Sequence, residues 1–135
     1  MPTIQFQSGD RISNRMRALL IDLAPHVVVV GSVARGCLVP KDLDLLFDFD
    51  SDIAYRRIKA IVARHDIPFE SCFPGNWCWR EWTMIEVLGM HYGRSYLACR
   101  RKAQQQEFWG VKLWVAPAAF CLSREQQADS IDTPE

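Results

Sequence analysis

The sequence predicts an α/β (α+β) domain in which a mixed β-sheet is flanked by helices. Three segments carry this prediction: residues 10–24, 26–31 and 42–49. The first has apolar residues at helical spacing, the second is a continuous β-branched run typical of a strand covered on both faces, and the third alternates apolar and acidic residues. Because 135 residues leave no room for a second domain of ordinary size, we expect one domain over 1–127 and a polar tail over 128–135.

The elements follow from local signals along the chain. Asp10 is expected to cap the first helix and Pro25 to end it. Gly36 and Pro40 indicate that residues 32–41 form a loop, in which residues 33–35 can form one helical turn. The later elements are expected in this order: a helix over 52–65 capped by Asp50 or Ser51, a strand over 67–73, a turn over 74–76, a strand over 82–88, a helix over 95–106, a strand over 111–116 and a short helix from Pro117.

Composition excludes several classes of protein. Sixteen Lys and Arg balance sixteen Asp and Glu, which argues against a binder of long nucleic acids, since such proteins carry a basic excess. No apolar run approaches the ~20 residues that a membrane span requires. The five cysteines are odd in number and form no CxxC pair, so we expect reduced thiols in a cytoplasmic protein rather than a disulfide framework or a zinc site.

Two short motifs are associated with the first two predicted strands: one follows the first strand and the other lies on the second. Gly31 and Ser32 come where the buried strand ends, and successive backbone N–H groups at such a turn can hold a bulky anion. Asp42 and Asp44 stand two residues apart on the next strand, so their side chains share one face. Two neighbouring carboxylates repel each other unless a cation lies between them, and Mg²⁺ is the cation that suits oxygen ligands beside phosphates.

The combination of Gly31-Ser32, nine intervening residues and then Asp42-x-Asp44 resembles the signature of the DNA polymerase β-like nucleotidyltransferase superfamily. It is most similar to the short, stand-alone minimal nucleotidyltransferases. The resemblance covers residues 27–49 well and the order of elements to about residue 120 more loosely. It implies a nucleotidyltransferase-like sheet in which the glycine–serine turn holds a nucleoside triphosphate and the two aspartates hold two Mg²⁺ ions.

The family also places a third acid on a later strand, where it helps to bind the metal that activates the attacking hydroxyl. Glu86 fits this position because it lies within an apolar strand, where a carboxylate needs a partner. Glu70 is the alternative. Arg35 and Lys41, in the loop between the two motifs, are expected to add positive charge for a triphosphate.

Other clusters allow more than one interpretation. Trp77, Trp79 and Trp82 either stack a nucleobase, dock a partner or form a hairpin that covers the sheet edge. A second acidic pair, Asp48 and Asp50, is read as strand-end and helix-cap residues. A short basic face is either solvated or a docking site for an acidic partner; it consists of Arg94, Arg100, Arg101 and Lys102.

These features lead to one expected function and one alternative. The expected function is Mg²⁺-dependent transfer of a nucleoside monophosphate, with AMP from ATP as the leading choice, to a hydroxyl group. The acceptor is expected to be a partner protein, by analogy with toxin–antitoxin pairs, or a small molecule. The alternative is a non-catalytic module that keeps the fold and binds nucleotide or protein. No membrane partner is expected, and homo- or hetero-oligomers are both compatible with the chain.

Overall fold

The computed structural model describes residues 4–7, 12–65, 70–73, 76–80, 84–89 and 95–121, and it describes only the backbone of residues 70–73, 76–80 and 84. The elements in chain order are α1 (Asn14–Leu23), the 3₁₀ turn η1 (Ala24–His26), β1 (Val28–Val30), α2 (Gly31–Ala34), β2 (Asp42–Leu46), α3 (Asp52–Arg64), β3 (Glu70–Phe73), β4 (Asn76–Arg80), β5 (Met84–Leu88), α4 (Tyr96–Arg101), β6 (Gln104–Phe108), β7 (Val111–Val115) and η2 (Ala118–Cys121).

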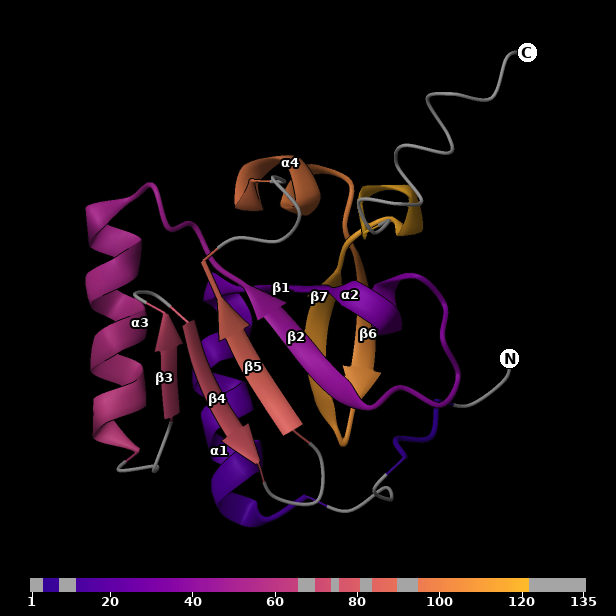
Figure 1. The fold of residues 1–135 in the computed structure, drawn as a ribbon, viewed down its shortest axis with the longest axis horizontal. Coiled ribbons are helices and arrows are strands. Elements are labelled where there is room, and N and C mark those ends of the chain that lie inside the picture. The colour runs from indigo at the N-terminus through magenta and orange to yellow at the C-terminus, as the bar shows by residue number, and fades with distance from the viewer. Residues whose placement is uncertain are drawn as a thin grey trace.

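Seven strands form one mixed sheet in the order β3-β4-β5-β2-β1-β7-β6 (Figure 1). At its centre, β2 runs antiparallel to β1 and parallel to β5. The parallel pairing of β1 with β7 extends the sheet on the other side. The mixed α/β class expected from the sequence is therefore confirmed at the level of secondary structure and sheet type.

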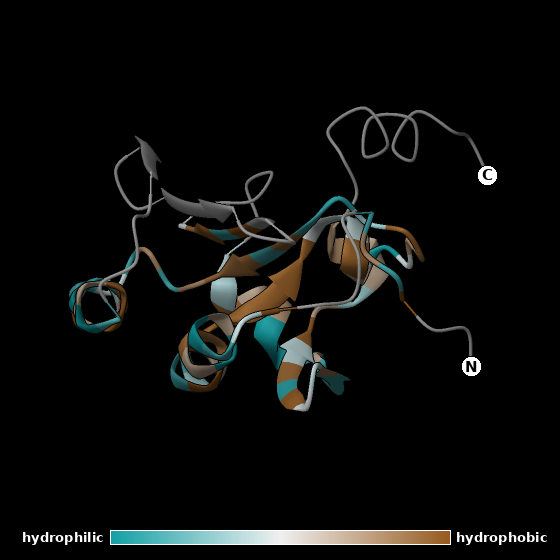
Figure 2. Ribbon diagram, turned by 90° about the horizontal axis from the view of Figure 1, so that it is seen from below, coloured by the Kyte–Doolittle hydropathy of each residue, from teal (hydrophilic) through white to brown (hydrophobic). Residues whose placement is uncertain are grey.

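The core has two parts, one on each face of the sheet. On the first face, α1 and α3 pack against alternate residues of the central strands, such as Val29, Leu45 and Val87. On the second face, Cys99 of α4 and Cys121 of η2 pack against the other set, which includes Val28, Val30 and Leu46. Figure 2 shows the hydrophobic residues concentrated in the central strands. All three residues of β1 are buried, as the β-branched run predicts for a strand that is covered on both faces.

Serine side chains begin three of the helices. Ser13, Ser51 and Ser95 accept hydrogen bonds from backbone N–H groups in the first turns of α1, α3 and α4. Of the two caps considered for α3, the structure selects Ser51. The expected cap at Asp10 is wrong because α1 begins only at Asn14; Asp10 itself lies outside the described residues.

Two expectations about the second half of the chain are also corrected. The helix expected over 95–106 ends at Arg101, and residues 104–108 form β6. Residues 74–75 of the turn expected over 74–76 lie outside the described residues, and Asn76 begins β4, which the sequence did not predict as a separate strand. In the first half, the strand expected over 42–49 ends at Leu46.

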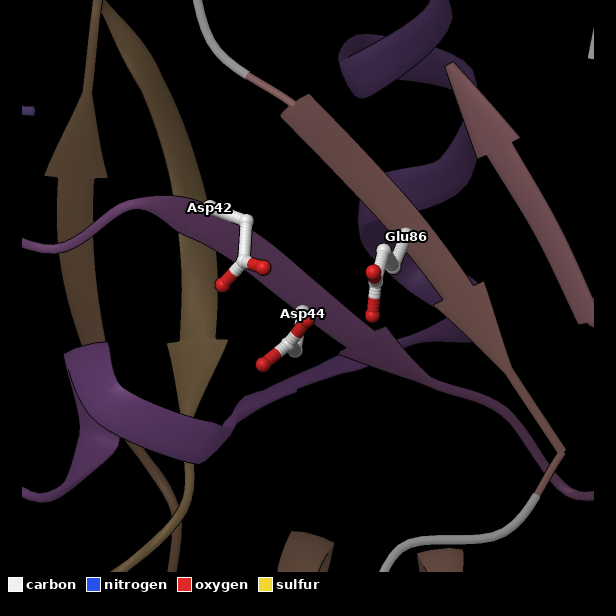
Figure 3. Close-up of side chains that lie close together, drawn as sticks. All are labelled: Asp42, Asp44 and Glu86. Carbon is white, nitrogen blue, oxygen red and sulfur yellow. The ribbon is translucent and has the colours of Figure 1, made fainter. Parts of the chain in front are cut away.

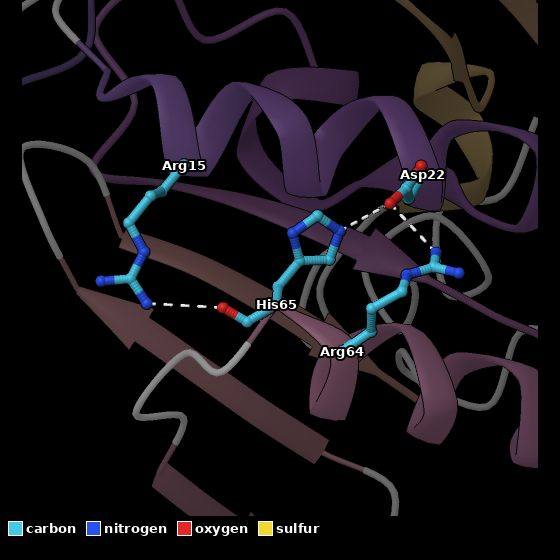
Figure 4. A network of polar contacts seen from close by, with 4 residues as sticks. All are labelled: Arg15, Asp22, Arg64 and His65. Atoms are coloured by element: carbon cyan, nitrogen blue, oxygen red, sulfur yellow. Dashed lines mark hydrogen bonds and ion pairs between the residues drawn. The ribbon is translucent and has the colours of Figure 1, made fainter.

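Helices α1 and α3 are joined by a polar network (Figure 4). The Asp22 carboxylate lies 2.6 Å from His65 Nε2 and 3.0 Å from Arg64 Nη2. Because a carboxylate only accepts, His65 Nε2 donates this hydrogen bond. Arg15 Nη2 donates a further bond to the carbonyl oxygen of His65, at 3.4 Å.

Within the described ranges, every helix is too short or too polar to span a lipid bilayer.

Candidate metal and nucleotide site

The two predicted motifs meet at one end of the sheet because β1 and β2 are antiparallel neighbours. Val30, the last residue of β1, lies opposite Asp44, near the beginning of β2. Asp44 in turn lies opposite Glu86 of β5, through the parallel pairing of the two strands. The loop of nine residues between Ser32 and Asp42 thus returns the chain to the end of the strand it has just left. The glycine–serine turn and the acidic residues are consequently adjacent.

Asp42, Asp44 and Glu86 project from the same face of the sheet (Figure 3). One carboxylate oxygen from each lies within 4.8 Å of the others. The alternation that puts Leu43 and Leu45 into the core leaves both aspartates on the opposite, half-buried face, as the sequence predicts. Glu86 is brought there by the register between β2 and β5.

Glu70, the alternative third acid, is placed elsewhere. It lies on β3, which is separated from β2 by β4 and β5. Three strand spacings amount to about 14 Å, which is too far for its backbone position to serve the same ion. The structure therefore brings Glu86, and not Glu70, to the two aspartates.

Asp42 and Asp44 lie beside each other and beside Glu86 in a partly buried setting. Burial, followed by the charges of Asp42 and Glu86, raises the pKa of Asp44 to about 8. Burial and then the charge of Glu86 also raise the pKa of Asp42. Asp44 Oδ1 is buried and has no hydrogen-bond partner among the described residues. Such an oxygen is costly unless a proton or a cation compensates it.

Gly31 contributes space to this site. Its φ is +73°, and a Cβ atom at this residue would collide with Oδ2 of Asp44. The sequence suggested that glycine here leaves room for a bound anion; the structure shows that it leaves room for the aspartate itself. No pattern in the sequence signals this contact, because it joins two strand regions.

The remaining candidate residues surround the acids. The charge of Lys41 acts to lower the pKa of Asp42, and that of Arg35 acts on both aspartates, although burial outweighs them. Arg35 Nη1 donates to the carbonyl oxygen of Cys121 at 3.0 Å, which holds the guanidinium beside the site. Ser32 is half-buried, and its carbonyl oxygen accepts from Cys37 N at 3.0 Å, which closes the turn.

The donor set suits a hard divalent cation. It consists of three carboxylates, and Mg²⁺ or Ca²⁺ bound at about 2.0–2.6 Å separates its ligand oxygens by up to about 4–5 Å. One carboxylate oxygen from each of the three residues lies within 4.8 Å of the others, which agrees with these oxygen–oxygen distances. A cation here would also give the buried Asp44 Oδ1 the partner that it lacks. The residues present therefore fit a metal ion.

The other predicted clusters belong to different elements from the three acids. Asp48 and Asp50 follow the end of β2, and neither caps α3. Trp77 and Trp79 belong to β4, while Trp82 and Arg94 lie outside the described residues. Arg100, from the predicted basic face, packs its guanidinium 3.5 Å from the ring centre of Trp114, a contact that the sequence did not indicate.

No protein-family model, no curated protein and no solved structure matches this chain. The site can nevertheless be described by its chemistry. Three carboxylates converge beside a tight glycine turn, with two cationic side chains near enough to act on their titration. This arrangement can hold a divalent cation and a polyanion next to each other.

Proposed function

We propose that the protein is a Mg²⁺-dependent nucleotidyltransferase with a nucleotidyltransferase-type fold. The observation that carries the proposal is the convergence of Asp42, Asp44 and Glu86, with oxygens within 4.8 Å of one another, beside the Gly31 turn. Supporting it are the spacing of the two motifs in the sequence and the buried, partnerless oxygen of Asp44 among the described residues. We further propose ATP as the nucleotide, with a hydroxyl of a partner protein or a small molecule as the acceptor.

In the proposed reaction, an oxygen of the acceptor hydroxyl attacks the α-phosphorus of the nucleotide. The bond between the α-phosphorus and the bridging oxygen to the β-phosphate breaks, pyrophosphate leaves, and the hydroxyl proton passes to a base or to water. Asp42, Asp44 and Glu86 would hold Mg²⁺, and the chemistry that the ion would supply there is neutralisation of phosphate charge and activation of the acceptor hydroxyl. Backbone N–H groups of the Gly31-Ser32 turn orient the triphosphate, and Arg35 and Lys41 add positive charge beside it.

The proposal is tested in two steps with the purified chain. The first measures binding of ATP with Mg²⁺, with Mn²⁺ and with EDTA; we expect binding that depends on the metal. The second incubates the chain with ATP labelled at the α-phosphate and with candidate acceptors, both proteins and small alcohols. We expect label on an acceptor and release of pyrophosphate.

Isosteric variants provide the controls. Asp42→Asn combined with Asp44→Asn should abolish both metal-dependent binding and transfer while the circular dichroism spectrum stays unchanged. Asp48→Asn, which changes an acid of the same strand region outside the site, should leave both intact. Metal-dependent binding without transfer to any acceptor would favour the non-catalytic alternative, and the absence of both would refute the proposal.

A further inference from the structure

Strand β6 forms one edge of the sheet. In the described part of the chain it pairs with β7 and with no other strand. Its first four residues, Gln104 to Glu107, are all exposed, whereas Phe108 is buried. The lining of a groove of about 710 Å³ includes Gln104, Gln105 and Gln106 of β6. The side chains of this strand are therefore accessible along most of its length.

The hairpin geometry determines which backbone groups face outward. The two-residue turn at Trp109 and Gly110 has φ values of 50° and 82°, typical of a type I′ turn, and makes Phe108 and Val111 the closing pair. In an antiparallel ladder, hydrogen-bonded and non-hydrogen-bonded pairs alternate. The N–H and C=O groups of Gln105 and Glu107 consequently point away from β7, toward the open edge.

The two edge strands of the sheet differ in whether they carry features that prevent pairing with a further strand. At the opposite edge, the register of β3 with β4 shifts between Ser71 and Phe73, and such an irregularity interrupts further strand addition. The pairing of β6 with β7 is regular over all five residues. Strand β6 contains neither proline nor lysine, the residues that commonly guard an exposed edge.

We propose that β6 is a self-association edge, at which two copies of this chain pair antiparallel through a two-fold axis at Gln106. In this register Gln105 lies opposite Glu107 of the partner subunit, and Glu107 lies opposite the partner's Gln105. All four outward-facing backbone groups of each strand then form hydrogen bonds to the other copy. The two sheets become one continuous sheet.

Side-chain charge favours a second copy and selects this register. Each Glu107 would lie between Lys112 of its own β7 and the partner's Gln105, whose amide can donate to the carboxylate. Only the neutral Gln106 meets its own copy at the axis. A shift to an axis at Glu107 would oppose two like charges, and a shift to Gln105 would require pairing at Ala103, outside β6. The edge is therefore self-complementary in one register.

The test uses the full chain and measures its mass by sedimentation over a concentration range up to about 1 mM, because an interface of a few strand residues is small and weak. We expect the mass to rise from 15.5 kDa toward twice that value. Gln106→Lys and Gln106→Glu place like charges at the axis, so each should weaken association at least about tenfold. An equimolar mixture of the two variants should associate again, as heterodimers, because the charges then attract.

Ala60→Lys is the matched control, since it adds the same charge at an exposed position of α3 and should leave association unchanged. Hydrogen exchange locates the interface: the amides of Gln105 and Glu107 should become protected as the concentration rises, and the circular dichroism spectra of the variants should match the wild type. A monomer at all concentrations, or association that persists in both Gln106 variants, would overturn the proposal. The test does not involve the metal site, so it stands or falls separately from the proposed function.

Discussion

Gly31 and Asp44 lie so close together that a side chain on Gly31 would occupy the position of the Asp44 carboxylate. The two residues belong to the neighbouring strand regions at which the two motifs meet. A residue larger than glycine would push the aspartate away from Asp42 and Glu86. The shape of the acidic site thus depends on an absent side chain as well as on the three carboxylates.

The first expectation concerns replacement of this glycine. Gly31→Ala should lower the free energy of unfolding by about 2–4 kcal/mol, through backbone strain at positive φ and overlap with Asp44. Gly36→Ala is the matched control, because Gly36 has φ +91° but no atom within 4 Å of the position that an alanine Cβ would take. The control should cost only about 1–2 kcal/mol in urea denaturation. Equal losses for the two variants would contradict a specific clash at Gly31.

The second expectation concerns metal affinity. Asp42→Asn, Asp44→Asn and Glu86→Gln each remove one charged ligand, so each should weaken Mn²⁺ or Mg²⁺ binding at least about tenfold in isothermal titration calorimetry. Glu70→Gln should bind the metal as the wild type does, because β3 lies three strands from β2. A loss in Glu70→Gln equal to that in Glu86→Gln would show that the third acid is assigned wrongly.

The third expectation concerns pH in the absence of divalent ions. The pKa of Asp44 is raised to about 8 from 3.8, so the folded state binds more protons than the unfolded state between these values. Stability is therefore greatest below about pH 4 for this group and falls, by on the order of 5 kcal/mol, as pH rises toward 8. In EDTA, Asp44→Asn should remove most of this slope and unfold less readily than the wild type at pH 8. Added Mg²⁺ should restore wild-type stability, and a flat wild-type profile would show that Asp44 is not the titrating group.

The fourth expectation concerns the contact between α1 and α3. The hydrogen bond from His65, followed by the charges of Arg64 and His65 against the opposing effect of burial, lowers the pKa of Asp22. Its stabilising contribution is thus present above the unfolded pKa of 3.8 and disappears as pH falls below that value. Asp22→Asn should cost about 0.5–1 kcal/mol at pH 7 and almost nothing near pH 2, measured by thermal unfolding. Asp50→Asn, an exposed carboxylate outside the network, should show neither effect.

Local sequence patterns predicted much of this structure. The apolar spacing in α1 and α3, the valine run of β1 and the alternation in β2 are properties of single segments, and all four elements appear near their expected positions. The three acids could be singled out because two alternate on one strand and the third is a charge within an apolar run. These patterns can be recognised without knowing which other strands or helices each segment packs against.

The elements that the sequence did not predict depend on pairing with other segments of the chain. Residues 104–106 are polar enough to suit a helix, yet they form β6 because the positive φ values of Trp109 and Gly110 fold the chain back onto β7. Strand β4 was missed because its tryptophans suggested a surface cluster, whereas it fills the space between β3 and β5. The apolar setting of Glu86 already favoured it over Glu70, but excluding Glu70 required the strand order, which pairing between distant segments decides.

The parallel pairing of β2 with β5 also has a consequence for folding kinetics. Asp44 and Glu86 become neighbours only after the chain between them, which includes α3, β3 and β4, has been arranged. Contacts of such long sequence separation are expected to form late in folding. If Asp44 and Glu86 are not yet neighbours in the transition state, a cation that needs both carboxylates cannot bind that state. We expect Mg²⁺ to slow unfolding in stopped-flow experiments while leaving the refolding rate unchanged. The bound ion would then slow the unfolding of a structure that folds without needing the ion.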